Sequence, residues 1–271
     1  MKIGVTGANG FVGKELVNRG CLPIRSDILN DEELTKEIFE SGVEKIIHCA
    51  AITSPEECEK DNKQAFEVNV RGTKNVVNAC NRNGIHFVYI SSDHIFSGKN
   101  RPKGGYGIKS LPNPVNYYGF TKFAAEGFTT SFSRKWTVVR TSHLFNAASI
   151  NAILKPLPFF PHIEVSNVIE KSFVHLTHFV NGLIDASHYY NKIINVAGSE
   201  ILTEYTLLTE SCVGLNPPSA FIVSRNYLLE DFDASVVLRP VHGGLNVSKS
   251  KELGISIYSY RDGFELLRNG V

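Results

Sequence analysis

Short apolar runs alternate with amphipathic stretches through the first half of the chain. Five runs have the length and composition of buried strands, at residues 2–6, 21–26, 44–51, 86–92 and 136–142. Between them, apolar residues recur at helical spacing, at residues 11–19, 31–42, about 63–83 and around Tyr118. Strands separated by helices imply right-handed crossovers and a parallel sheet. The pattern therefore predicts a doubly wound α/β fold.

Beyond residue 145 the alternation becomes irregular. Residues 173–190 have the apolar spacing of a helix, and residues 192–198 form another apolar run that we expect to return to the sheet. The chain is therefore expected to divide into a domain at 1–145, rejoined by 173–198, and a smaller lobe within 146–271.

The composition is that of an ordinary soluble globular protein, with 42% hydrophobic and 20% charged residues among 271. A net charge of +1 predicts no broad attraction to nucleic acid or to a membrane surface. Five cysteines without C-x-x-C spacing indicate reduced thiols. No apolar run approaches the ~18 residues of a membrane span, and Met1 leads directly into a strand without a signal-peptide pattern. We therefore expect a cytoplasmic protein.

A glycine-rich loop, TGANGFVG at residues 6–13, joins the first strand to the first helix. Gly7 permits a tight turn, Gly10 lets the backbone approach a pyrophosphate, and Gly13 lets helix and strand pack closely. The helix N-terminus would offer free N–H groups to the phosphates. The loop predicts a Rossmann-type dinucleotide-binding domain at 1–145, with the remaining lobe binding substrate. The expected cofactor contacts in this loop are Gly7, Asn9, Gly10, Phe11, Val12 and Gly13.

The residues after the second strand leave the form of the cofactor open. Asp27 lies 20 residues after Gly7, where an acid would bind the adenosine ribose hydroxyls and favour NAD. Arg25 could instead meet a 2′-phosphate and favour NADP. NADP and NAD therefore both stay candidates.

Tyr118 and Lys122 stand one helical turn apart in NYYGFTK. A cation beside a phenol favours the phenolate, so this spacing predicts a lowered pKa for Tyr118. Such a tyrosine could transfer a proton to a carbonyl oxygen or take one from a hydroxyl. The spacing alone is weak, because it occurs by chance in many helices.

The glycine loop, the fourth strand and the Tyr/Lys helix together resemble the extended short-chain dehydrogenase/reductase family. Within it, the chain is most similar to the dTDP-4-dehydrorhamnose reductases, which reduce a 4-keto-6-deoxy nucleotide sugar. The segments that carry the resemblance are HCAAIT (48–53), NVRGTKNV (69–76), YISSDHIFSG (89–98), RTSHLF (140–145) and LRPVHGGLNVSKSKELGI (238–255).

The resemblance implies an oxidoreductase with a nucleotide-sugar substrate. Its catalytic residues would be Ser92, Tyr118 and Lys122. Further cofactor contacts would come from Cys49, Ala50, Ala51, Asn69, Tyr118 and Lys122, and substrate contacts from Thr53, Ser92, His94 and His143. No metal is expected, since His175 and His178 lack a third ligand of suitable spacing. The protein could also form a homodimer, a question that the sequence leaves open.

Departures from the reductase pattern keep two other functions in view. Ser92-Asp93-His94 lacks the glutamate of the related 4,6-dehydratases, which argues against dehydration. His143 stands where the reductases often carry tryptophan, and residues 165–179 replace a segment that shapes the sugar-nucleotide pocket. The alternatives are a sugar-nucleotide 4-epimerase and a non-catalytic, dinucleotide-binding regulatory subunit.

Overall fold

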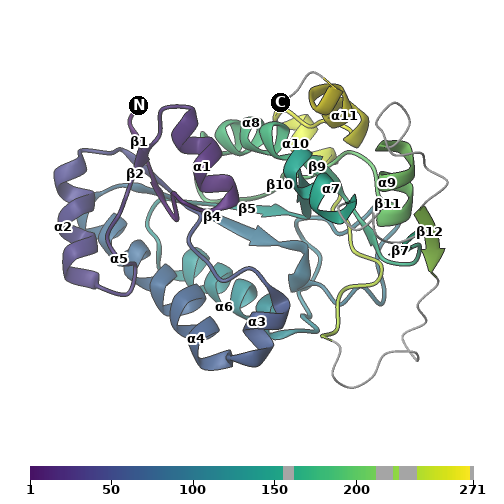
Figure 1. Ribbon diagram of the computed structural model, residues 1–271. Helices are drawn as coiled ribbons and strands as arrows, with labels where there is room; N and C mark the ends of the chain where they lie inside the picture. Colours follow the sequence, from purple (N-terminus) through teal and green to yellow (C-terminus); the bar gives the residue numbers. More distant parts are fainter. Residues whose placement is uncertain (155–161, 212–221, 226–236, 269–271) are drawn as a thin grey trace.

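The computed structural model describes residues 1–154, 162–211, 222–225 and 237–268. Its centre is a parallel sheet of six strands in the order β10-β5-β4-β3-β1-β2 (Figure 1). The strands are β1 (Ile3–Thr6), β2 (Leu22–Pro23), β3 (Lys45–His48), β4 (His86–Ser92), β5 (Trp136–Thr141) and β10 (Lys192–Asn195). This sheet confirms the predicted doubly wound α/β class.

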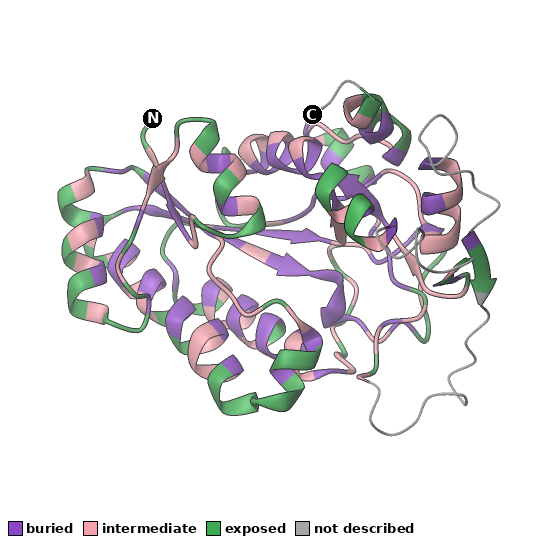
Figure 2. Ribbon diagram, viewed as in Figure 1, coloured by how far each residue is buried: buried purple, intermediate pink, exposed green. Residues whose placement is uncertain are grey.

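Helices cover both faces of the sheet (Figure 1). One face carries α2 (Asp31–Ser41), α5 (Thr73–Asn83) and α6 (Tyr117–Phe132), and the other carries α1 (Phe11–Asn18) and α8 (Leu176–Ala186). The side chains of consecutive strand residues lie on opposite faces of the sheet. Ile46 packs with the first group of helices and Ile47 with the second. The strands are buried between the two layers (Figure 2), as expected of a parallel sheet.

Three predicted elements differ from the structure at their boundaries. The second strand shrinks from six residues to Leu22–Pro23, because it is an edge strand and pairs only with β1. The helix expected at 63–83 consists of α4 (Asn62–Phe66), a π-helical segment η1 (Glu67–Gly72) and α5, after a short α3 (Pro55–Lys60). Residues 173–175 form a strand rather than the start of α8.

A smaller group of elements lies beside the carboxyl ends of the sheet strands (Figure 1). It contains three two-stranded pairs: β6 (His143–Phe145) with β9 (Phe173–His175), β7 (Ile163–Ser166) with β12 (Ile222–Arg225), and β8 (Glu170–Lys171) with β11 (Leu202–Thr203). Its helices are α7 (Ala147–Leu154), α9 (Glu204–Ser211) and α11 (Tyr260–Arg268), whereas α10 (Ser248–Glu252) packs against β10 of the main sheet. The exact division of the chain at residue 145 stays a prediction.

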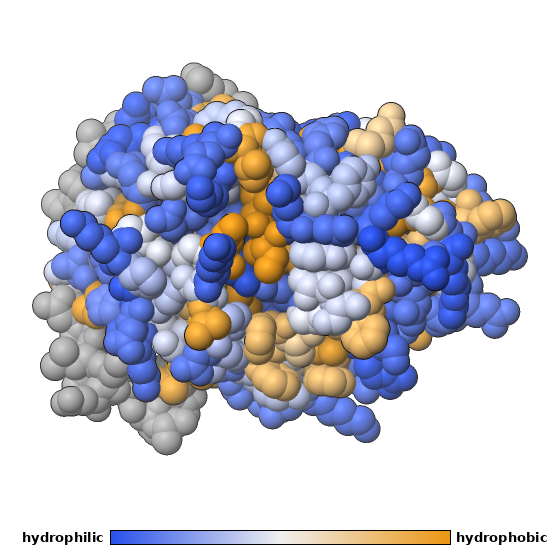
Figure 3. Space-filling model, turned by 180° about the vertical axis from the view of Figure 1, so that it is seen from behind, coloured by the Kyte–Doolittle hydropathy of each residue, from blue (hydrophilic) through white to orange (hydrophobic). Residues whose placement is uncertain are grey.

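The reverse face of the molecule is hydrophilic over most of its area, with apolar side chains gathered in a band near its middle (Figure 3). Among the described residues, no helix combines the length and the apolar character needed to cross a bilayer.

Candidate active site

A cavity of about 380 Å³ lies at the carboxyl ends of the sheet strands. Ligands bind at this edge in doubly wound folds. The cavity brings together eleven of the predicted site residues: Gly10, Phe11, Val12, Gly13, Cys49, Ala51, Thr53, Ser92, Tyr118, Lys122 and His143. Six others do not line it: Gly7, Asn9, Asp27, Ala50, Asn69 and His94.

The glycine loop is shaped by close backbone contacts. Gly7 has φ +67°, and a Cβ there would lie 2.5 Å from the Ala50 nitrogen. A Cβ on Gly13 would lie 2.1 Å from the Gly7 oxygen. Gly10 precedes α1 and carries no capping side chain, so the first N–H groups of the helix are not covered by one. Gly7 therefore packs the loop against the backbone after β3, and Asn9 is exposed in the same loop.

The two residues that would choose the form of the cofactor are both exposed beyond β2. The Asp27 carboxylate accepts a hydrogen bond from the Leu29 N–H at 2.9 Å. The backbone N–H of Arg25 donates to the Glu37 carboxylate at 2.9 Å.

Helix α6 places the Tyr/Lys pair against the end of β4. The Asn116 side chain accepts a hydrogen bond from the Gly119 N–H at 2.7 Å and so fixes the start of the helix. Lys122 Nζ then lies 4.4 Å from the centroid of the Tyr89 ring. Ser92 ends β4, and its hydroxyl accepts from the His94 N–H at 3.2 Å. The three predicted catalytic side chains thus meet in one cavity.

The predicted lowering of the Tyr118 pKa is wrong. Burial raises the pKa of the Tyr118 phenol, and Asp93 raises it further, while a hydrogen bond with Ser92 acts in the opposite direction. Burial also lowers the pKa of Lys122 to about 8, against the influence of Cys49 and Glu126. Desolvation of the buried phenol is the largest of these influences. The phenol is consequently held in its protonated form at neutral pH, as a proton donor requires.

Asn69 and His94 support the cavity without lining it. The Asn69 side chain accepts from the Ile52 N–H at 2.8 Å and donates to the Thr121 hydroxyl at 3.0 Å, which ties the loop after β3 to α6. The buried His94 ring lies edge-on to Tyr118, with 5.4 Å between centroids. Asn69 is therefore a bridge between two walls of the cavity, and His94 packs behind the phenol.

The sequence interpretation missed several strand-end residues on the cavity wall. His48 ends β3, and its Nδ1 and Nε2 lie 2.6 Å and 3.1 Å from the hydroxyls of Thr6 and Thr73. Ser142 follows β5 and donates to Asp93 at 2.5 Å. Both residues line the cavity. Both could have been predicted from their positions at strand ends, because the carboxyl ends of parallel strands meet at one edge of the sheet.

The buried His48 should make stability fall in acid. Burial, followed by the charge of Lys122, lowers the pKa of His48 from 6.5 to about 3. The unfolded chain therefore binds a proton between those values that the folded protein does not. The free energy of unfolding should be fully retained above pH 6.5 and should decrease toward pH 3 by up to about 1.4 kcal/mol per pH unit.

Urea unfolding at a series of pH values measures this dependence. His48→Asn should flatten it relative to the wild type, whereas the same change at the exposed His188 should not. An identical pH dependence in His48→Asn and wild type would contradict the assignment.

Fold and cavity together define a class: the chain has an extended short-chain dehydrogenase/reductase domain, with its glycine loop and its Ser/Tyr/Lys set in one cavity. The model of the family described as "RmlD substrate binding domain" matches residues 1–157. The chain therefore belongs to that family.

Individual relatives and structures agree with this assignment. The dTDP-4-dehydrorhamnose reductase of Mycolicibacterium smegmatis is 30% identical over 152 residues, or 53% of this chain and 46% of the relative. The match thus spans about half of that relative's length. Methionine adenosyltransferase 2 subunit beta of Danio rerio is 24% identical over 94% of this chain and 85% of its own. The crystal structure of dTDP-4-dehydrorhamnose reductase from Bacillus anthracis in complex with NADP covers all of both chains, with a TM-score of 0.87 and 25% identity.

Proposed function

We propose that the protein is an NAD(P)H-dependent reductase of a keto group on a nucleotide-linked deoxysugar, similar to the dTDP-4-dehydrorhamnose reductases. The observation that carries this proposal is one cavity lined both by the glycine loop and by Ser92, Tyr118 and Lys122. The NADP-bound structure of the Bacillus anthracis reductase, which superimposes over the whole chain, supports it.

The residues present fit a dinucleotide cofactor. The backbone cradle has no room for side chains at Gly7 and Gly13, and it lies at the start of α1, where phosphates bind. Cys49, Ala51 and Lys122 would border the nicotinamide end. When bound, the reduced cofactor supplies the hydride. The exposed Arg25 would favour NADP and Asp27 would favour NAD.

The chain's own residues would supply the proton and the electrostatics. Tyr118, held protonated by burial, would donate its phenolic proton to the carbonyl oxygen. The Ser92 hydroxyl would donate a hydrogen bond to the same oxygen. Lys122 would place a positive charge beside the reacting groups, which favours the phenolate that Tyr118 becomes once it has given up its proton.

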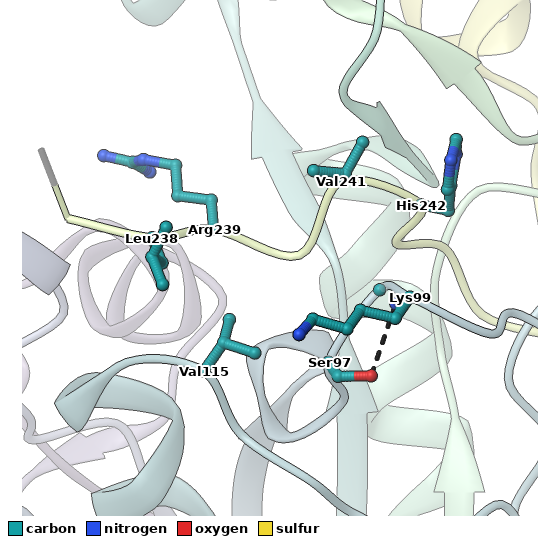
Figure 4. A pocket seen from close by; sticks show the side chains of 8 residues that line it. Ser97, Lys99, Val115, Leu238, Arg239, Val241 and His242 are labelled. Carbon is teal, nitrogen blue, oxygen red and sulfur yellow. Dashed lines mark hydrogen bonds between the residues drawn. The ribbon is translucent and has the colours of Figure 1, made fainter. Parts of the chain in front are cut away.

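A second hollow would receive the nucleotide part of the substrate (Figure 4). It measures about 260 Å³ and is bordered by residues 97–99 and 238–242, with Val115 between them. Lys99 and Arg239 carry positive charge suited to a diphosphate; the Arg239 guanidinium also pairs with the Glu56 carboxylate. Asn116 connects the two sites, because its side chain donates to the Leu238 carbonyl at 2.8 Å and lies 3.1 Å from His94, which packs on Tyr118.

Removing the charge of Arg239 should weaken substrate binding. Arg239→Met should raise KM for the nucleotide sugar about tenfold with little change in kcat, because a contact with the phosphates is the same in substrate and transition state. Steady-state kinetics with varied sugar measures both constants. The exposed Arg134→Met is the matched control and should leave KM unchanged. A fall in kcat at constant KM would contradict this role of Arg239.

The activity is tested by following oxidation of NADPH and of NADH in the presence of dTDP-4-keto-6-deoxymannose. Turnover with either cofactor supports the proposal, and the ratio of the two rates identifies the preferred form. Retention of bound NAD without net consumption would instead support the 4-epimerase.

The non-catalytic regulatory subunit is the second candidate. It is favoured by the similarity to methionine adenosyltransferase 2 subunit beta over 94% of the chain. The complete Ser92, Tyr118 and Lys122 set in one cavity counts against it. Turnover of any keto sugar would exclude a purely structural role. The cytoplasmic location and a homodimer stay predictions.

A further inference from the structure

A contact between Lys171 and His143 has no part in the reaction described above. Lys171 Nζ lies 3.4 Å from His143 Nδ1. His143 lines the same cavity as Tyr118 and Ser92. Both members of the pair are half-buried. The contact therefore joins a cationic side chain of the smaller group of elements to the wall of the proposed active site.

Lys171 is held in place through its two neighbours in the chain. On one side, Glu170 Oε2 lies 2.9 Å from His242 Nδ1. On the other side, the Ser172 N–H donates to the Ser142 hydroxyl at 3.2 Å. Strand β8 itself pairs with β11. Because the backbone is anchored on both sides of Lys171, the position of its Cα, from which the long side chain extends, is fixed.

The His143 ring is fixed as well. In the pairing of β6 with β9, His143 stands opposite Phe173, and the two rings pack with 5.0 Å between centroids. With Nδ1 directed to Lys171, the other ring nitrogen, Nε2, has no hydrogen-bond partner among residues 1–154, 162–211, 222–225 and 237–268. It is the atom of this ring left to meet a ligand.

The chemistry of the pair determines which nitrogen carries the proton. A lysine ammonium has only donors, so His143 Nδ1 must accept and the ring proton must sit on Nε2. Burial, followed by the charges of Lys171, His94 and Arg239, lowers the pKa of His143 to about 3. Burial lowers the pKa of Lys171, and the Asp93 and Glu204 carboxylates act in the opposite direction.

We infer that Lys171 is a positioning residue that holds His143 as a neutral imidazole, whose Nε2–H donates a hydrogen bond to an oxygen of the substrate sugar. This inference rests on the proposed function for the identity of the substrate, but not for the state of the ring. The sugar must therefore present an acceptor oxygen on the side of the cavity where His143 lies. This oxygen is either a ring hydroxyl or the carbonyl itself.

The state of the ring is tested by nitrogen NMR of the full-length protein with ¹⁵N-labelled histidine. At neutral pH, the wild-type His143 should show the neutral, Nε2-protonated form. Lys171→Met should show a mixture of the two neutral forms and should take up a proton at higher pH than the wild type. Lys103→Met, at an exposed site, is the control. A wild-type ring that is charged or protonated on Nδ1, or a Lys171→Met spectrum identical to the wild type, would overturn the inference.

Kinetics provides the second test. Lys171→Met and His143→Phe should each raise KM for the keto sugar about tenfold, as expected for loss of one hydrogen bond. The double variant should be no worse than either single one, because both act on the same contact. Lys171→Arg keeps a donor and should stay near the wild-type KM. Additive effects in the double variant would count against the inference. If the wild type reduces no keto sugar, the proposed function fails while the NMR result still decides the state of the ring.

Discussion

Tyr118→Phe should lower kcat for keto-sugar reduction by about 10²- to 10⁴-fold, the usual contribution of a positioned general acid. The change removes one oxygen and leaves a ring of the same shape in the cavity. Burial keeps the wild-type phenol protonated, so its loss removes the proton that the carbonyl oxygen needs. Binding of the dinucleotide should change little, because the glycine loop is untouched. Stopped-flow or steady-state oxidation of NADPH measures the effect, and a fluorescence titration measures binding.

The neighbouring Tyr117 provides a matched control. Its ring packs against Phe120, with 5.4 Å between centroids, rather than facing the cavity. Tyr117→Phe should therefore keep nearly all of the activity. If Tyr118→Phe were as active as Tyr117→Phe, the proposed proton donor would be wrong.

Gly13→Ala should abolish dinucleotide binding and destabilise the protein. The new Cβ would lie 2.1 Å from the Gly7 oxygen and 2.9 Å from the Ala8 Cα. Both are backbone atoms, so the loop must shift away from the shape that receives the phosphates. Overpacking of this kind costs about 1–3 kcal/mol in the free energy of unfolding. Calorimetric titration with NADPH and NADH, together with urea unfolding, measures the two effects.

Gly127→Ala makes the same change in a helix that has room for it. No heavy atom lies within 4 Å of a Cβ at Gly127. Alanine favours helix over glycine by up to about 1 kcal/mol, so this variant should be as stable as the wild type or more so, with unchanged cofactor binding. Normal binding in Gly13→Ala would show that the loop does not cradle the dinucleotide.

The sequence predicts the fold and the cofactor loop well because both depend on local patterns. Strand, glycine loop and helix follow one another within residues 2–19, and Tyr118 and Lys122 share a helix face through their spacing alone. Ser92 was placed correctly at a strand end. These features need no knowledge of contacts between distant segments.

What the sequence could not predict depends on burial and on distant contacts. The Tyr118 pKa moves opposite to the prediction because burial of the phenol, which spacing does not reveal, raises it. Lys171 and His143 lie 28 residues apart in the chain, and the pairing of β6 with β9 brings their segments together. The sequence also does not reveal that the amide of Asn69, a predicted cofactor contact, bridges two cavity walls. Each of these features depends on contacts that form only when the sheet is assembled.

The central claim is that a hydride is transferred, within this cavity, from a dinucleotide to the carbonyl carbon of a sugar. It is tested most directly by incubating the protein with dTDP-4-keto-6-deoxymannose and NADPH or NADH deuterated at the transferable position of the nicotinamide, followed by mass spectrometry and NMR of the sugar. The account predicts one deuterium on the former carbonyl carbon for each cofactor oxidised, in the wild type and in Tyr117→Phe but not in Tyr118→Phe. A sugar that is recovered unchanged with both cofactors, or reduced without deuterium at that carbon, would contradict it.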